Sequence, residues 1–333
     1  MLKIAIIGLG DVSKVHIPAI QNNINAKLVA VCDIDKSLKD TVDQTTFYSD
    51  YKTMLKMESL DCVHICLPHH LHYPVAKACV ESGAHVLLEK PIASSVKDGL
   101  SLVELEQKNK DIKIGVSFQN RLNETFLKLQ ELIASGAYGE VLGIKGIVTW
   151  CRPKSYYDMK PWRGKMNEAG GGVMINQSIH TLDYMQLIGG NISSIRGTVD
   201  NLIENGHEVE DTAVAHIRFQ SGATGLFFAT TTNAINSSVE FQVVLEKGKL
   251  TIKDNILTTV NETGNKEKIV EDSRLDGSKF YYGASHTKII DQFYQCIIND
   301  KQNYVHVKEG QITMQMIDAI YRSSAQKSLV EWR

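Results

Sequence analysis

The sequence predicts an α/β protein with two parts: an N-terminal Rossmann dinucleotide-binding domain and a C-terminal α/β domain with a large, mostly antiparallel open sheet. Up to about residue 118, apolar strands alternate with amphipathic helices, a pattern typical of a parallel sheet covered on both faces. A glycine-rich turn follows the first strand. Beyond about residue 190, strand-like segments succeed one another without helices between them, which favours antiparallel pairing.

The first part is expected to form a regular series of strands and helices. Apolar runs predict strands over residues 2–7, 27–32, 62–67, 85–88 and 113–116, with a short extended segment at 46–48. Amphipathic stretches predict helices over residues 11–21, 35–42, 50–57, 73–82 and 96–108. Each helix links two strands, as in βαβ units.

The second part begins near residue 120 and has a different pattern. Helices are predicted over residues 124–135, 173–188, 286–299 and 309–327. Strands are predicted over residues 141–150, 195–201, 212–219, 223–231, 239–246 and 249–253. A polar, irregular segment covers residues 151–168. We therefore expect domains over residues 1–120 and 121–333.

Composition excludes several classes of protein. The formal net charge is −2 and no basic stripe occurs, which argues against a nucleic-acid surface. No apolar stretch is long enough to cross a bilayer, and the first apolar run ends in glycines where a signal peptide would have a cleavage site. We therefore expect a cytoplasmic protein with neither nucleic acid nor membrane as a partner.

The six cysteines are too sparse for a disulfide framework in a chain of 333 residues. Cys62, His64 and Cys66 share one parity of a predicted strand, so a metal site is conceivable. The simpler interpretation is that these thiols pack as small apolar side chains, because no carboxylate or CxxC spacing completes a site. We expect no metal.

The turn from Gly8 to Ser13 has the context of a dinucleotide-binding loop. Gly8 permits the tight turn, and Gly10 lets the backbone approach a pyrophosphate at the start of a helix. Ser13 stands where glycine or alanine is usual. Asp33 ends the second strand, where a carboxylate can accept both ribose hydroxyls and repel a 2′-phosphate. Lys36 could soften that repulsion, so NAD is favoured and NADP stays possible.

A lysine closes the fifth strand. Lys90 follows an apolar run and stands between Glu89 and Pro91. Ligands of open α/β sheets bind outside the carboxyl ends of the strands, so we expect Lys90 to lie beside the reacting groups. Taken alone, an ordinary lysine at the end of a strand would be the better interpretation.

A glycine triplet precedes a helix with a polar stripe. Asn176, His180 and Asp183 stand at i, i+4 and i+7 and would share one face of a helix over residues 173–188. Such a stripe is costly if it is buried without a purpose. Asp183 could orient the His180 ring; the alternative is a core histidine satisfied by a neighbouring aspartate.

These motifs together resemble the glucose–fructose oxidoreductase / inositol dehydrogenase / rhizopine catabolism (Gfo/Idh/MocA) family nearly from end to end. The resemblance rests on the order and spacing of Gly8-x-Gly10 with His16, Cys66-Leu67-Pro68 with His72, Glu89-Lys90-Pro91, Gln119-x-Arg121, Trp162-Arg163, and Gly170-Gly171-Gly172 with Asn176, His180 and Asp183. It implies a Rossmann NAD(P)-binding domain and a C-terminal domain for substrate binding and oligomerisation. It also implies a homodimer or homotetramer.

The resemblance implies oxidation or reduction of a sugar, sugar derivative or cyclitol with NAD or NADP. Lys90 matches the catalytic lysine and His180 the catalytic histidine. The inositol-dehydrogenase branch has aspartate where this chain has Asn176, which weakens an inositol assignment; enzymes similar to UDP-N-acetylglucosaminuronate 3-dehydrogenase have asparagine there. We expect catalytic roles for Lys90, His180, Asn176 and Asp183.

The remaining site residues follow from position. Cofactor contacts are expected from Gly8, Gly10, Asp11, Val12, Ser13, Asp33, Pro68, His72, Glu89, Lys90 and Gln119. The polar segment 151–168 should line the substrate cleft, because arginine and aromatic side chains suit a sugar and arginine can hold a carboxylate or phosphate. Substrate contacts are expected from Arg152, Tyr156, Trp162, Arg163, Asn176 and His180. A structural crossover loop is the alternative for that segment.

Three other functions remain open at this point. A non-catalytic NAD- and sugar-binding regulator could share the fold, although a pure binder need not keep both Lys90 and His180. An NAD-dependent glycosidase would oxidise and re-reduce its substrate transiently and release a free sugar. A general NAD-binding scaffold is opposed by the polar stripe near His180.

Overall fold

The computed structural model describes residues 1–203, 206–261, 263–273 and 285–332. The chain divides into two compact units. The first contains Met1–Gln119 and Ala284–Gln311, and the second contains Asn120–Gly283 and Ile312–Arg333. The boundary expected near residue 120 therefore misses a return of the chain into the first unit.

The first unit contains one parallel sheet in the order β3-β2-β1-β4-β5-β6. Its strands are β1 (Leu2–Ile7), β2 (Ala26–Cys32), β3 (Thr46–Tyr48), β4 (Cys62–Ile65), β5 (His85–Glu89) and β6 (Ile114–Ser117). Every pairing among them is parallel, as predicted. The direction in which strands are added reverses between β1 and β4, and such a switch point is where open α/β sheets bind ligands.

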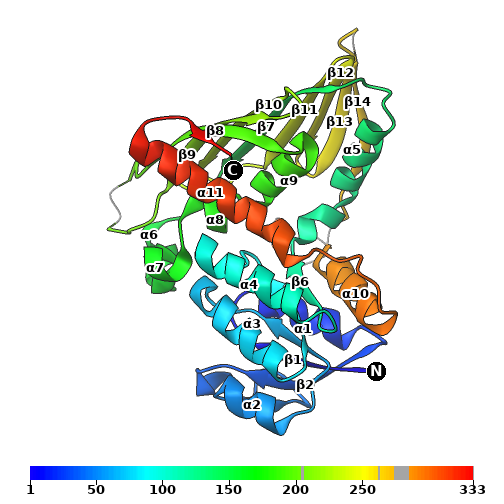
Figure 1. Cartoon of the computed structure of the whole chain (residues 1–333), viewed down its shortest axis with the longest axis vertical. Helices are drawn as coiled ribbons and strands as arrows, with labels where there is room; N and C mark the ends of the chain where they lie inside the picture. The colour runs from blue at the N-terminus through cyan, green and yellow to red at the C-terminus, as the bar shows by residue number, and fades with distance from the viewer. Residues whose placement is uncertain (204–205, 262, 274–284, 333) are drawn as a thin grey trace. The chain divides into compact units, whose positions relative to one another are not determined.

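Helices connect these strands. They are α1 (Ser13–Gln21), α2 (Tyr51–Met57), α3 (His72–Glu81), α4 (Val96–Lys108) and, from the later segment, α10 (Ser285–Ile298). The helices α3 and α4 lie side by side (Figure 1), and α10 packs against α1. The amphipathic pattern of α10 shows that one of its faces must be covered but not which sheet covers it, so its place was not predicted.

One predicted helix of the first unit is wrong. Residues 35–42 form only a short 3-10 turn, η1 (Lys36–Leu38), followed by irregular turns. The Asp35 carboxylate accepts a hydrogen bond from Ser37 N at 2.9 Å. Such a local bond offers the backbone an alternative to a helix.

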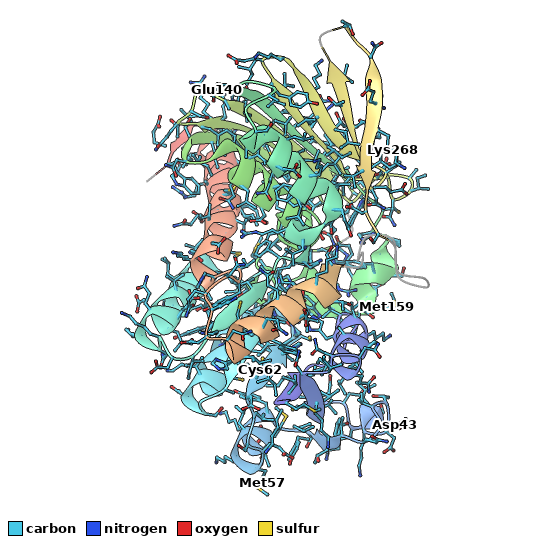
Figure 2. All side chains as sticks on the ribbon, turned by 90° about the vertical axis from the view of Figure 1, so that its right-hand side faces the viewer. Asp43, Met57, Cys62, Glu140, Met159 and Lys268 are labelled. Atoms are coloured by element: carbon cyan, nitrogen blue, oxygen red, sulfur yellow. The ribbon has the colours of Figure 1, made fainter. Side chains whose placement is uncertain are left out.

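The cysteines behave as apolar packing residues. All six are free thiols, and only Cys151 is not buried. Figure 2 shows Cys62 inside the first unit, whereas Met57, at the end of α2, lies at its periphery and is 71 % exposed. Burial raises the pKa of Cys62 well above its ordinary value, so its thiol stays protonated.

The second unit contains a nine-stranded sheet in the order β14-β13-β12-β11-β7-β10-β9-β8-β15. Its strands are β7 (Val141–Thr149), β8 (Ile192–Asp200), β9 (Thr212–Phe219), β10 (Thr224–Thr230), β11 (Glu240–Leu245), β12 (Gly248–Lys253), β13 (Ile256–Asn261), β14 (Lys266–Glu271) and β15 (Val330–Glu331). Only the pair of β7 and β10 is parallel among the pairings of these described strands. The sheet is mixed but mostly antiparallel, as predicted; β13, β14 and β15 were not predicted.

One face of this sheet packs against helices. The helices α8 (Val173–Asn176) and α9 (Ile179–Gly189) contact β7, β9 and β10, and α5 (Glu124–Ala134) contacts β12, β13 and β14. A Cβ atom on Gly146 would lie 2.5 Å from Thr181 Cγ2, so only glycine lets α9 approach β7 so closely. This contact fixes α9, which carries His180.

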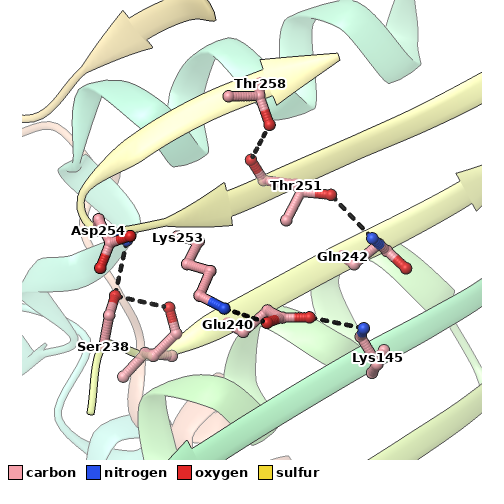
Figure 3. Close-up of polar contacts among 9 residues, drawn as sticks. Lys145, Ser238, Glu240, Gln242, Thr251, Lys253, Asp254 and Thr258 are labelled. Carbon is pink, nitrogen blue, oxygen red and sulfur yellow. Dashed lines mark hydrogen bonds and ion pairs between the residues drawn. The ribbon is translucent and has the colours of Figure 1, made fainter. Parts of the chain in front are cut away.

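The opposite face of the sheet is largely polar. Figure 3 shows Glu240 of β11 between Lys145 of β7 and Lys253 of β12, at 2.6 and 3.0 Å. Beside them, Gln242 Nε2 donates to Thr251 Oγ1 at 2.9 Å. Apolar side chains also lie together on this face: Phe228 of β10 pairs with Val214 of β9 and Ile147 of β7, and Leu226 of β10 is 48 % exposed.

Candidate active site

The glycine turn has the shape that the sequence predicted. Gly8 has φ +95°, and a Cβ atom there would lie 2.4 Å from the Cys66 carbonyl oxygen, so a larger residue is excluded. A Cβ atom on Gly10 would meet no described atom within 4 Å. The open space at Gly10 fits a backbone that a pyrophosphate approaches closely.

The rest of the turn holds itself together. The Ser13 hydroxyl, which is buried, donates to the Gly10 carbonyl at 2.7 Å. The Val12 carbonyl accepts from Val15 N at 3.0 Å and so begins α1. Asp11 is exposed, with its carboxylate 4.0 Å from Lys14 Nζ. Ser13 therefore closes the loop with its side chain, which explains how the turn tolerates serine at this position.

The Asp33 carboxylate is tied to the glycine turn. Its Oδ2 atom accepts from Leu9 N at 2.8 Å, and its Oδ1 atom accepts from Asp35 N at 2.9 Å. The end of β2 and the glycine turn are thereby joined. A carboxylate oxygen has more than one acceptor site, so Asp33 can still accept hydroxyl groups while it holds the loop.

His72 is placed behind the ligand-binding edge. It has no exposed surface, and its Nδ1 and Nε2 atoms lie 2.7 Å from the Pro91 carbonyl and 2.8 Å from the Leu67 carbonyl. Burial lowers the pKa of His72, although the two carbonyls favour the cation. The neutral ring donates to one carbonyl at a time. Such a side chain braces the loops after β4 and β5 and presents no free group to a cofactor. Pro68 follows Leu67 in the loop after β4, at the start of a short 3-10 turn.

Lys90 follows β5 directly, at the carboxyl edge of the parallel sheet. Burial lowers the pKa of Lys90, while the neighbouring charge of Glu89 partly opposes that effect. Burial alone would raise the pKa of Glu89, but the hydrogen bond and charge of His16, followed by the charge of His286, hold it well below its usual range. Gln119, just after β6, is 3 % exposed. The edge of this sheet thus combines an ionised carboxylate with an amine of lowered basicity.

In the second unit, the predicted single helix over residues 173–188 is wrong. The chain forms α8 and then α9, with a break at Gln177 and Ser178. The Ser178 hydroxyl donates to the Val173 carbonyl at 2.8 Å, a back-bond that competes with helix continuation. Asn176 therefore ends one helix and His180 lies in the first turn of the next, so they do not form a stripe on one helix.

A buried carboxylate that sequence reasoning missed anchors this segment. Glu210 is 4 % exposed and accepts from Gly172 N at 2.8 Å and from Met174 N at 3.0 Å. The Tyr321 hydroxyl donates to the same carboxylate. A Cβ atom on Gly172 would lie 1.9 Å from the Glu210 carbonyl oxygen, which explains the glycine. Glu210 lies far from α8 in sequence, and no local pattern could have identified it.

Asp183 is engaged by an arginine. Arg121 donates from Nε and Nη2 to the two Asp183 carboxylate oxygens, both at 2.7 Å, and Gln186 Nε2 lies 3.2 Å from Oδ1. Asp183 is 1 % exposed. The forked pair fixes the start of the second unit to α9. Its placement makes Asp183 an anchor of α9, in addition to any effect on His180.

The polar segment 151–168 forms α6 (Lys154–Asp158), η4 (Pro161–Gly164) and α7 (Met166–Ala169). The guanidinium carbon of Arg163 lies 4.2 Å from the Tyr156 ring centroid, and that of Arg152 lies 5.2 Å from it. Gln177 Nε2 lies 3.2 Å from the Tyr156 hydroxyl. Arg152, Tyr156 and Arg163 therefore lie together with Gln177, which follows Asn176 in sequence. The guanidinium carbon of Arg163 also lies 5.9 Å from the Trp162 ring centroid.

The sheet order, the glycine turn and the carboxylate at the end of β2 define a dinucleotide-binding protein of the Rossmann class. Two family models match the chain: one for the oxidoreductase family with an NAD-binding Rossmann fold, over residues 2–118, and one for the GFO/IDH/MocA C-terminal domain, over residues 126–251. The chain belongs to the Gfo/Idh/MocA family of oxidoreductases. The resemblance drawn from the motifs is thereby confirmed.

Three relatives of this chain are named as dehydrogenases. Myo-inositol 2-dehydrogenase of Thermotoga maritima is 25 % identical, over 84 % of this chain and 82 % of its own. D-glucoside 3-dehydrogenase of Escherichia coli is also 25 % identical, over 99 % of this chain and 97 % of its own. The crystal structure of the WlbA dehydrogenase of Bordetella pertussis, in complex with NADH and UDP-GlcNAcA, is 26 % identical with a TM-score of 0.86, over 100 % of this chain and 99 % of that one.

Within the described residues, no helix is both long and apolar enough to cross a membrane.

Proposed function

We propose that this protein transfers a hydride between nicotinamide and a carbinol carbon of a sugar, sugar derivative or cyclitol. The observation that carries the proposal is the half-buried Lys90, whose pKa is lowered by desolvation and which follows β5 at the carboxyl edge of a parallel sheet whose glycine turn is open at Gly10. Myo-inositol, D-glucoside and WlbA dehydrogenases as relatives support this substrate class.

The proposed cofactor is NAD, with NADP as the alternative. NAD, when bound, accepts the hydride. Gly8, Gly10 and the start of α1 would hold the pyrophosphate, and Asp33 would accept the ribose hydroxyls. Its carboxylate would repel a 2′-phosphate.

Asp33→Asn tests this assignment. We expect kcat/KM with NAD to fall about 10- to 150-fold, because a charged hydrogen bond contributes roughly 1.5–3 kcal/mol. The ratio of activity with NADP to that with NAD should rise. Steady-state kinetics with both cofactors measure it. A matched control is Asp35→Asn, nearby on the same loop. An unchanged cofactor ratio in Asp33→Asn would contradict the role of Asp33.

Lys90 and His180 are proposed to handle the proton of the carbinol. His180 would act as the general base, and the Lys90 ammonium would donate to the reacting oxygen and stabilise developing negative charge. The lowered pKa of Lys90 makes the neutral amine available as an alternative base. Asn176 would position the hydroxyl group, since an amide cannot take up a proton. Asp183 would act through α9, which it anchors to Arg121.

The cluster of Arg152, Tyr156, Trp162 and Arg163 is proposed to bind the substrate. Two guanidinium groups on one tyrosine ring suit a substrate with a carboxylate or phosphate. His72, buried behind the loops, is proposed to support the cofactor site indirectly.

Formation of reduced nicotinamide tests the proposed function. The purified protein is given NAD or NADP with a panel of aldoses, cyclitols, uronates and nucleotide sugars. A substrate-dependent increase in reduced nicotinamide is expected. Binding of both cofactor and sugar without reduction would favour a regulator or a transiently oxidising glycosidase.

The outer face of the nine-stranded sheet is proposed to associate with a second copy of the chain, giving a homodimer or homotetramer. Lys145 and Lys253 both pair with Glu240 within the sheet (Figure 3), so these three side chains would keep their partners if this face were covered. Leu226 and Val214, 48 % and 37 % exposed, provide apolar contact area. A cytoplasmic location remains a prediction.

Leu226→Glu tests this face. We expect the substitution to shift the protein toward monomer in sedimentation velocity, because it buries a new unpaired carboxylate. Leu127→Glu is the matched control, since Leu127 lies on α5 and is 46 % exposed. An unchanged sedimentation coefficient in Leu226→Glu, or an equal change in both variants, would contradict the proposal.

A further inference from the structure

Four hydrogen-bonded side chains cross the interior of the first unit. His16 Nε2 lies 2.8 Å from Glu89 Oε1, and His16 Nδ1 lies 2.8 Å from His64 Nδ1. His64 Nε2 lies 2.9 Å from the Tyr294 hydroxyl. None of the four residues is more than 5 % exposed. They come from α1, β5, β4 and α10, so this buried series of hydrogen bonds joins four elements and ends at the Glu89 carboxylate.

The direction of these hydrogen bonds follows from the end at Glu89. A carboxylate only accepts, so His16 donates from Nε2. If His16 is neutral, His64 donates to it and Tyr294 donates to His64. If His16 is cationic, it donates in both directions, and the neutral His64 donates to Tyr294. Burial and the nearby His16 hold the pKa of His64 well below its ordinary value. In both orders every bond is made and Glu89 stays ionised.

Glu89 is the residue directly before Lys90, and the residue directly after Lys90 is also held. The Pro91 carbonyl lies 2.7 Å from His72 Nδ1, whose other nitrogen lies 2.8 Å from the Leu67 carbonyl. The backbone of Lys90 is thus fixed on one side through a side chain and on the other through a carbonyl. Both supports are buried, and neither uses Lys90 itself.

We propose that His16, His64 and Tyr294 on one side, and His72 on the other, are positioning residues that hold Lys90 for the reaction. The proposal rests on the proposed role of Lys90. His16 belongs to α1, which begins at Ser13, the last residue of the glycine turn. The hydrogen bond from His16 to Glu89 therefore also joins the helix after the glycine turn to the residue before Lys90.

The same series of hydrogen-bonded side chains also acts on Lys90 through the charge of Glu89. The ionised Glu89 raises the pKa of Lys90 against the opposing effect of burial. The groups that lower the pKa of Glu89 are His16 from α1, then His286 from α10, whose Nε2 atom lies 3.8 Å from Glu89 Oε1, and the Ser117 hydroxyl from β6. Burial raises the pKa of Cys66, and the charge of Glu89 adds to that shift. The same charge partly offsets the burial that lowers the pKa values of His64 and His72.

The same region could be interpreted as a metal site. His16, Glu89 and His286 offer three ligand atoms within 4.8 Å of one another. The hydrogen-bond order favours positioning, because His16 Nε2 already carries the proton that it donates to Glu89. Stoichiometric zinc in the purified protein that is lost on His286→Ala would overturn the proposal.

The test compares His16→Leu with His16→Gln. Leucine removes both ring nitrogens, whereas the glutamine amide can still donate to Glu89. The matched control is His306→Leu, because His306 Nδ1 also lies 2.9 Å from a glutamate, Glu106, in the same unit. Measurements are kcat, the KM values of cofactor and substrate, their pH dependence, and the melting temperature.

For His16→Leu we expect kcat to fall up to about 100-fold, the cost of a small misplacement of a catalytic group, with smaller changes in KM. Without its donor, the buried Glu89 becomes protonated more easily, so its charge no longer raises the pKa of Lys90. The Lys90 limb of the pH profile should therefore move to lower pH. His16→Gln should restore most of kcat and the limb, and His306→Leu should change only the melting temperature.

A measurement without substrate separates this inference from the proposed function. The side-chain ¹⁵N resonance of Lys90, assigned by its loss in Lys90→Met, is titrated in the folded proteins. A lower Lys90 pKa in His16→Leu than in wild type and His16→Gln supports the inference even if no substrate is found. An unchanged Lys90 pKa in folded His16→Leu, or a kcat within about twofold of wild type, would overturn it.

Discussion

Lys90→Met is expected to lower kcat/KM by about a thousandfold or more, because loss of a positioned proton-transfer or charge-stabilising group costs roughly 10²–10⁴-fold. Binding of the cofactor should change little, since the glycine turn and Asp33 remain. Lys113→Met is the matched control. Lys113 is 2 % exposed, pairs with Asp300 at 2.7 Å and precedes β6, so it lies at the amino end of a neighbouring strand. Near-normal turnover in Lys90→Met would contradict the mechanism.

The pH profile shows which form of Lys90 acts. Burial lowers its pKa from the ordinary 10.5, so Lys90 loses its proton at lower pH than a free lysine. If the ammonium is required, kcat/KM for oxidation falls as the pH rises through that pKa. If the neutral amine is the base, kcat/KM rises there. In either case this limb should be absent from the residual activity of Lys90→Met.

His180→Asn is expected to lower kcat about 10²–10⁴-fold, the usual contribution of a general base. The KM for substrate should change less, because asparagine keeps a hydrogen-bonding group of similar reach. A control is His306→Asn, which changes a histidine of the first unit whose Nδ1 atom lies 2.9 Å from Glu106. Rates equal to wild type in His180→Asn would transfer the role of base to Lys90.

Local patterns predicted most elements of the fold. The apolar run of β1, the helix α4 and the alternation in β9 gave their observed bounds, because each pattern is set by burial of one face or both. The helix predicted over residues 50–57 is α2, and its N-cap Asp50 accepts a hydrogen bond from Thr53 N at 2.9 Å. Such features depend only on residues that are close in sequence, so one sequence is enough to predict them.

Tertiary features could not be predicted in this way. The break between α8 and α9 depends on the hydrogen bond from Ser178 to the Val173 carbonyl. It also depends on Glu210, which lies just before β9 and holds the start of α8. The assignment of α10 to the first unit depends on contacts with residues far away in sequence, such as that of Tyr294 with His64. The contacts of His72 with the Leu67 and Pro91 carbonyls were not predicted, and its contact with the cofactor stays a prediction.

The candidate site was predicted by residue type better than by contact. The sequence predicted that Arg152, Tyr156 and Arg163 belong to one site, and the structure brings them together. The roles of Lys90, Asp33 and Asp183 stay predictions, and the forked pair of Asp183 with Arg121 was not predicted. Sequence reasoning also missed the chain from Tyr294 to Glu89, because four elements supply its members. Buried polar networks are joined by topology, which no periodicity reveals.

The central claim is net hydride transfer to the nicotinamide, and a count of products tests it most directly. After a substrate has been found, the amounts of reduced nicotinamide, oxidised product and free sugar are measured over one reaction course. We predict one reduced nicotinamide for each substrate oxidised, with no glycosidic bond broken. Release of a free sugar without net reduced nicotinamide would contradict the account.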